Sequence, residues 1–176
     1  MSLRKKEITE ATAAVTYINS LAERIKCDWD EIHKGLKDLS KDKHIIKNER
    51  EAIDAYCRAS IAIGMQAVRN IFSAEQTERL NAWIMYFLDD ENRAEVMKYN
   101  EIYEKAVEDL EEPVGTVSGV LLFQWLGKDV KKLKGLGLRF QFLVMYIDET
   151  FLRNGEYWKI VKEKYKLTES DLPLPQ

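Results

Sequence analysis

The sequence predicts an all-α fold: a single-domain bundle of roughly six or seven helices, opening with a long heptad-patterned N-terminal helical region. Three observations support this prediction. Apolar residues recur at alternating spacings of three and four from Ile8 to Leu39, which places them along one face of a helix. All three prolines lie at position 113 or later, so the first 112 residues contain no obligatory helix breaker. No segment shows the apolar–polar alternation that is typical of a half-buried strand.

The N-terminal stripe fits either one long helix or two helices in phase. Asp28 and Glu31 resemble a capping box, with Cys27 placed to pack on Ile32, and this favours a break before residue 28. This stripe could be buried inside the protein's own helical bundle or form a seam between subunits. Burial inside the bundle is the favoured alternative. The residues proposed for such an interaction seam are Ile8, Val15, Ile18, Ile25, Trp29 and Ile32.

The middle of the chain predicts three further helices. Charged residues at 40–43 indicate a turn, and the small residues of 46–72 predict a central helix that neighbours approach closely. Ser73 followed by Gln76 predicts a capped third helix. Residues 89–112 predict a fourth, acidic helix, which we expect to close at 113–115.

Glycines concentrate in the next segment, since five of the eight lie between Gly115 and Gly137. We expect a short buried helix at 120–126, a short basic helix at 128–134 and a turn at 135–137. Residues 138–152 predict a buried helix that is apolar nearly all round, and Asn154 is placed to cap a last helix through about 165. The predicted organisation is one helical domain, 1–167, followed by an extended tail, 168–176.

Cysteine usage and hydropathy indicate a cytoplasmic protein that makes no membrane contact. The two cysteines are too few for a disulfide framework. The N-terminus turns polar at once, unlike a signal peptide, and no apolar run is long enough to span a bilayer.

No metal site and no other cofactor is predicted. Cys27, His33, His44 and Cys57 lie within 31 residues but lack the close ligand pairs of zinc modules. Asp30 precedes His33 by three residues, yet the second half of a di-iron site is missing. Two histidines in a charged region indicate no Ser-His or Cys-His nucleophile.

An acidic face is formed by Glu101, Glu104 and Glu108, which share one side of the predicted fourth helix. Clustered carboxylates suit magnesium that carries a nucleotide's phosphates, so a magnesium-dependent all-α nucleotide phosphohydrolase is one hypothesis. Against it, Glu101 pairs with Lys105 at i,i+4, as solvated helices do, and no second helix supplies obvious carboxylates.

A basic segment at 128–139 supports a different hypothesis, a nucleic-acid-associated protein. The predicted helix that follows is core-like instead of an exposed recognition helix, and the chain carries a net charge of −3, so nucleic acid is not the favoured partner. The residues of this basic segment are Lys128, Lys131, Lys132, Lys134 and Arg139.

The favoured interpretation is a non-enzymatic helical binding protein, acting as an adaptor, inhibitor or regulator through protein–protein contacts. We expect it to self-associate as a homodimer, and the acidic helix is a second docking surface for a basic partner. A small-molecule cavity is a further hypothesis, because fourteen of the eighteen aromatic residues lie at Trp83 or beyond.

Overall fold

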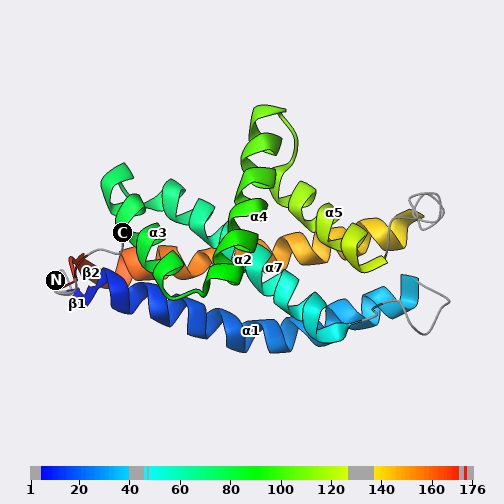
Figure 1. Ribbon diagram of the computed structural model, residues 1–176, viewed down its shortest axis with the longest axis horizontal. Coiled ribbons are helices and arrows are strands. Elements are labelled where there is room, and N and C mark those ends of the chain that lie inside the picture. The colour runs from blue at the N-terminus through cyan, green and yellow to red at the C-terminus, as the bar shows by residue number, and fades with distance from the viewer. Residues whose placement is uncertain (1–4, 40–45, 47, 127–136, 171–172, 174–176) are drawn as a thin grey trace.

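The computed structural model describes residues 5–39, 46, 48–126, 137–170 and 173. Within these residues the chain forms six helices and one two-stranded sheet, so the predicted helical bundle is confirmed, and the sheet is an addition (Figure 1). The elements in chain order are β1 (Lys6–Thr9), α1 (Glu10–Leu39), α2 (Glu49–Ile71), α3 (Ala74–Tyr86), α4 (Asp90–Glu108), α5 (Pro113–Leu126), α7 (Gly137–Lys164) and β2 (Tyr165–Thr168).

The two longest helices, α1 and α7, run antiparallel beside each other along the molecule (Figure 1). With 30 residues, α1 is about 45 Å long at 1.5 Å per residue. Arg24 donates to the carbonyl oxygen of Arg153 at 3.2 Å, and Arg139 donates to that of Asp38 at 3.4 Å. These contacts join the two helices at well-separated points.

The expected break in the N-terminal helix does not occur, because α1 is continuous from Glu10 to Leu39. Asp28 is not a cap: it is buried against α7, with its carboxylate 3.8 Å from the guanidinium of Arg153. Cys27 is exposed and therefore does not pack onto Ile32. Ile8 lies in β1 and pairs with Leu167 of β2, so it is not part of the helix.

The central position predicted for the second helix is confirmed, since α2 packs against α1, α3, α4, α5 and α7. Asn48 caps α2 by accepting from the backbone N–H of Glu51. At Gly64, an added Cβ would lie 1.8 Å from the hydroxyl oxygen of Tyr17. The Tyr17 hydroxyl itself donates to the carbonyl of Ser60 at 3.2 Å, so α1 and α2 approach closely here.

Helix α3 begins where the predicted Ser73 cap places it, and α4 begins close to the start expected at residue 89. Ser73 accepts from the backbone N–H of Gln76, and Asp89 accepts from that of Asn92. The expected closure of the acidic helix at 113–115 is wrong, because α4 ends at Glu108 and Leu110 takes a left-handed conformation with φ 56°. Pro113 instead opens α5, where its missing N–H costs no helical hydrogen bond.

The C-terminal part of the chain departs most from prediction. The short helix expected at 120–126 is the second half of α5, which starts at Pro113. The two helices expected from 138 onward are one helix, α7. Asn154 is a buried residue inside α7, so it caps nothing. The helix expected at 128–134, residues 135–136 of the turn expected at 135–137, and the turn at 40–43 lie outside the described residues, while Gly137 is the first residue of α7 with φ 50°.

The sheet joins the two ends of the described chain. Strand β1 pairs with β2 in parallel, in the register Lys6↔Tyr165 to Thr9↔Thr168. The predicted start of an extended tail at 168 is thus the last residue of β2. Beside this sheet, the buried carboxylate of Glu10 accepts two hydrogen bonds from the guanidinium of Arg79, at 2.9 and 3.0 Å.

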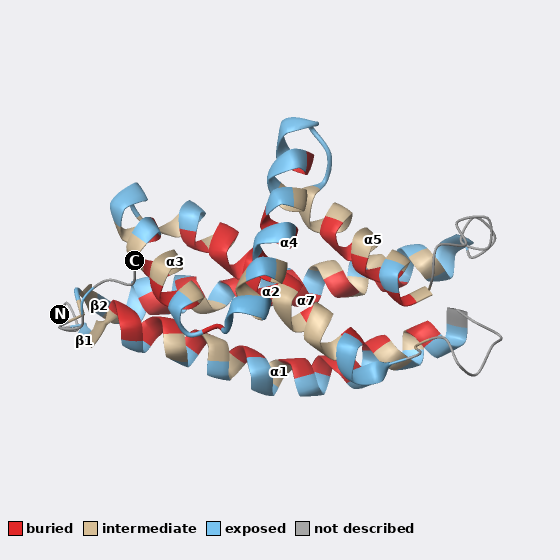
Figure 2. Cartoon of the chain, in the orientation of Figure 1, coloured by how far each residue is buried: buried red, intermediate tan, exposed pale blue. Residues whose placement is uncertain are grey.

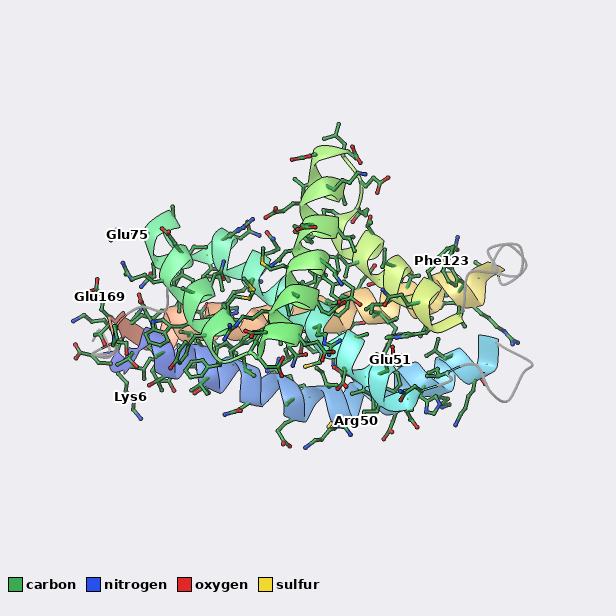
Figure 3. The ribbon with its side chains drawn as sticks, in the orientation of Figure 1. Lys6, Arg50, Glu51, Glu75, Phe123 and Glu169 are labelled. Carbon is green, nitrogen blue, oxygen red and sulfur yellow. The ribbon has the colours of Figure 1, made fainter. Side chains whose placement is uncertain are left out.

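Arg79 also lies near two carboxylates whose side chains are exposed. Glu75 is 3.1 Å away and Glu169 is 3.7 Å away, and Figure 3 shows both labelled side chains at the same end of the molecule. Arg79 therefore ties the start of α1, the start of α3 and the residue after β2 together. A bidentate pair with a buried carboxylate is the strong form of such a contact.

The core lies between the inward faces of the helices. Buried and exposed turns alternate along α1, while the tip where α4 meets α5 is exposed (Figure 2). No described helix has both the length and the hydropathy to cross a bilayer.

Candidate protein interaction site

The predicted interaction seam lies largely inside the chain's own core. Ile25, Trp29 and Ile32 are buried, and Val15 and Ile18 are half-buried. The Trp29 indole packs edge-on against Trp125 with ring centroids 5.5 Å apart, and its Nε1 donates to Glu49 Oε1 at 3.0 Å. Trp29 thus contacts α2 and α5, and the burial of Ile25, Trp29 and Ile32 leaves little of the seam for another protein.

A second apolar stripe lies on the outward face of α7. Leu138, Phe142, Met145 and Leu152 are 70%, 65%, 64% and 59% exposed, respectively. They follow one another at spacings of four, three and seven, so they share one side of the helix. The helix at 138–152 was predicted to be buried, and this is wrong for the side that carries these four residues.

The opposite face of α7 fixes the helix in the bundle. Its buried residues include Leu143, Ile147 and Phe151, and the hydroxyl of Tyr56 donates to Thr150 Oγ1 at 2.5 Å. Burial in this region raises the pKa of Tyr56 far above its ordinary value, so the phenol stays protonated and remains a donor. A helix held in this way presents its outward stripe as a preformed surface.

Asp148 ties α7 to α5. Its carboxylate accepts a hydrogen bond from the hydroxyl of Ser118. Burial raises the pKa of Asp148, the Ser118 hydrogen bond opposes that rise, and nearby Glu112 adds to it. The carboxylate thus positions α7 and does not form part of the exposed stripe.

The predicted acidic face does not converge into a metal site. Glu101 and Glu108 are exposed, and Glu104 accepts from the Arg69 guanidinium at 2.5 Å. Across the part of the chain that the structure describes, no group of three or more His, Cys, Asp or Glu side chains could hold a metal ion. The geometry therefore adds no support to the phosphohydrolase hypothesis.

Most of the predicted basic segment cannot be placed. Lys128, Lys131, Lys132 and Lys134 lie outside the described residues, and Arg139 is exposed near the start of α7. Arg139 donates a hydrogen bond to a backbone carbonyl of α1, so this residue takes part in the packing of α7 on α1.

The cysteine and histidine residues that are described do not gather. Cys27 is exposed, whereas Cys57 is half-buried and burial raises the pKa of its thiol to about 11. His33 stacks on Trp29, with its Nδ1 3.0 Å from Glu49 Oε1. His44 lies outside the described residues.

A cavity of about 540 Å³ lies between α2, α3 and α4. None of its lining residues is aromatic, so it is not the aromatic-framed cavity that the sequence suggested. Glu104 of the predicted acidic face borders it. The lining residues are Met65, Arg69, Ala74, Thr77, Glu78, Asn81, Met97, Asn100 and Glu104.

The geometry thus provides two features on which function can be argued, the outward stripe of α7 and the cavity over α2. Searches against protein-family models, curated proteins and solved structures find no match to this chain. What the protein does must accordingly be argued from its own surfaces.

Proposed function

We propose that this protein is a helical protein-binding protein that self-associates through the outward face of α7. The observation that carries the proposal is the exposed stripe of Leu138, Phe142, Met145 and Leu152 on a helix whose other face is firmly packed. Contiguous exposed apolar surface of this kind marks interaction sites. The area of the stripe and its residue pattern both favour a second copy of the chain as the binding partner.

The area of the stripe suits a small dimer interface. The four side chains are 59–70% exposed. Taking roughly 150–250 Å² for a large apolar side chain, they present roughly 400–650 Å². A standard interface buries about 800 Å² on each partner, so the stripe would supply more than half of it. Among the exposed polar residues of α7, Gln141 lies beside the stripe, whereas Glu149 lies within it, four residues after Met145 and three before Leu152.

The two leucines of the stripe are symmetric about Met145, whereas the position equivalent to Phe142 is Asp148. Leu138 and Leu152 lie seven residues before and seven residues after it, and both are exposed. An antiparallel pairing with a two-fold axis at Met145 therefore places Leu138 of one copy against Leu152 of the other. Two-fold interfaces require this kind of match, because each patch meets its own copy.

Two polar residues of α7 are also placed symmetrically about Met145. Gln141 and Glu149 lie four residues before and after Met145, and both are exposed. The pairing brings the amide donor of Gln141 to the carboxylate of Glu149 of the other copy, twice per dimer. This contact sets the register while the apolar stripe supplies most of the affinity.

Sedimentation velocity tests the proposal, at protein concentrations from about 1 to about 100 µM, the range in which small interfaces dissociate. We expect the parent to dimerise with rising concentration and Met145→Glu to stay monomeric, because the variant places two like charges on the axis. Leu110→Glu is the matched control, since Leu110 is 93% exposed on the α4–α5 turn. A parent that is monomeric throughout, or a Met145→Glu variant that dimerises like the parent, contradicts the proposal.

Disulfide trapping tests the geometry. In a Cys27→Ser background, which removes the exposed native thiol, Met145→Cys should form a covalent dimer under mild oxidation. Leu152→Cys should not, because its own copies would stand about 20 Å apart, at 1.5 Å per residue, and a disulfide needs Cα atoms within about 7 Å. Efficient trapping at both positions would indicate parallel helices instead.

A further inference from the structure

The cavity between α2, α3 and α4 has the size and construction of a small-molecule site. Its volume of about 540 Å³ falls within the roughly 300–1,000 Å³ that is typical of ligand pockets. Helix α2 supplies Met65 and Arg69 to its lining, and the other lining residues come from α3 and α4. Met65 and Asn100 are buried, so the cavity has a floor within the fold.

On the α4 wall, Asn100 carries a side-chain amide whose donors are poorly used. Its Oδ1 accepts from Gln66 Nε2 at 3.2 Å. Its Nδ2 meets the Sδ atoms of Met65 at 3.8 Å and Met97 at 4.0 Å. Thioether sulfur is a weak acceptor, so this buried amide has N–H groups for which a stronger acceptor is missing.

On the α3 wall, two polar atoms have no hydrogen-bond partner among the described residues. They are Asn81 Oδ1 and Thr77 Oγ1, and Thr77 is only 8% exposed. Buried polar atoms are usually paired, because an unpaired one loses its hydration without compensation. Both residues border the same cavity as Asn100, but the two atoms are themselves buried, so a ligand in the cavity reaches them only when the Asn81 or Thr77 side chain rotates.

The charges of the lining argue against an anionic ligand. Arg69 is the single basic lining residue, and its guanidinium is already bound to Glu104 at 2.5 Å and to Gln66 Oε1 at 3.2 Å. Glu78 adds a second carboxylate to the lining. The lining therefore carries a net negative charge, which disfavours a phosphate.

The apolar part of the lining suits a flat ring. Met65, Met97 and Ala74 supply it, and methionine side chains adapt to irregular shapes and make favourable contacts with aromatic rings. A heterocycle with an acceptor beside a donor would pair with the Asn100 amide and with Asn81 or Thr77, while its faces contact the thioethers.

We infer that this cavity binds a neutral heterocycle carrying adjacent hydrogen-bond donor and acceptor groups, of the class of a nucleobase or an unphosphorylated nucleoside. The inference is independent of the self-association proposed for α7, because none of the residues lining the cavity lies on that helix. Phosphorylated nucleotides are excluded from the class by the acidic lining.

Isothermal titration calorimetry and ligand-observed NMR on the full chain test the inference, with adenine, cytosine, nicotinamide and adenosine as probes and AMP as the charged comparison. We expect at least one neutral probe to bind with a Kd in the millimolar range or below, the affinity usual for ligands of this size. Adenosine should bind at least tenfold more tightly than AMP.

Two variants locate the binding. Ala74→Phe fills the cavity from an exposed lining position, and Ala22→Phe on the exposed face of α1 is its matched control. Asn81→Leu removes the unpaired acceptor while keeping the side-chain size, so we expect it to melt no lower than the parent. Both cavity variants should weaken probe binding at least tenfold, and the control should leave it unchanged.

Three outcomes would overturn the inference. The first is the absence of binding by every neutral probe up to about 10 mM, well above the range usual for ligands of this size. The second is binding that folded Ala74→Phe and Asn81→Leu proteins retain in full. The third is AMP binding as tightly as adenosine, which would contradict the assigned ligand class.

Discussion

The long helices α1 and α7 carry similar apolar spacings and use them in opposite ways. On α1, the stripe faces inward, where Ile25, Trp29 and Ile32 are buried against the rest of the bundle. On α7, the stripe of Leu138, Phe142, Met145 and Leu152 faces outward while a separate apolar face packs on the core. The sequence pattern locates a stripe on a helix, but the neighbouring helices decide whether it is covered.

The number of apolar faces on each helix distinguishes α1 from α7. Helix α1 has one apolar face, and a single face is needed for the protein's own core. Helix α7 is apolar on two faces over residues 138–152, and packing against α1, α2 and α5 covers only one of them. The surplus face is the one available to a partner, and three experiments test this contrast.

The largest expected effect is a difference in unfolding free energy between substitutions in the α1 stripe and in the α7 stripe. Ile32→Ala should lower the free energy of unfolding by about 2–5 kcal/mol, because Ile32 is fully buried and the loss leaves a cavity. Phe142→Ala should change it by no more than about 0.5 kcal/mol in the monomer, as for other exposed positions. Urea unfolding at low protein concentration measures both. Similar losses at the two positions would break the comparison.

A smaller effect is expected where α1 meets α2. Gly64→Ala should destabilise the protein by about 1–3 kcal/mol, because the new Cβ would stand 1.8 Å from the Tyr17 hydroxyl oxygen and overpack the contact. The double variant Gly64→Ala/Tyr17→Phe should recover part of the loss, since it removes the nearest atom. Thermal unfolding of the two variants and the parent measures the recovery. An unchanged melting temperature in Gly64→Ala would show that α1 has room to move away.

The smallest effect concerns pH and the packed face of α7. Burial raises the pKa of Asp148 above its ordinary value of 3.8, so folding favours the protonated form. Its contribution to stability is therefore complete below the ordinary pKa and is lost as the pH rises through the raised one. Asp148→Asn should therefore gain stability relative to the parent as the pH rises above the ordinary value of 3.8 and the buried carboxyl ionises.

Chemical denaturation over a series of pH values measures the difference between Asp148→Asn and the parent. Asp30→Asn, at an exposed position of α1, is the control for losing one carboxylate. A difference that shrinks with rising pH would contradict the sign derived from burial.

Structural features that depend on a few neighbouring residues were predicted best. The cap at Ser73 and the small-residue helix α2 depend on local chemistry, and the structure confirms them. The strict heptad pattern of α1 was less accurate, because Tyr17 is buried whereas Ile18, a residue of the proposed seam, is only half-buried. A straight helix has 3.6 residues per turn, so its buried face drifts by about 20° per heptad from a 3.5-residue pattern.

Features that depend on distant residues were missed. Strands β1 and β2 have four residues each and pair across almost the whole chain, so neither is recognisable alone. Asn154 resembles a cap in sequence but is buried inside α7, where α2 approaches so closely that a Cβ on Gly155 would lie 3.0 Å from Ala67. The polar groups of the cavity come from two helices, and only the fold places Asn81 and Asn100 on its opposite walls.

The parallel sheet also has a consequence for the order in which the chain folds. Lys166 and Glu7, which form an ion pair across it at 2.9 Å, are 159 residues apart in sequence. Closing a loop of that length costs much more chain entropy than forming a helical turn, and two four-residue strands return little in exchange. The sheet can therefore form only once α1 and α7 lie side by side, which makes it the last element to assemble and the first to open when the bundle loosens.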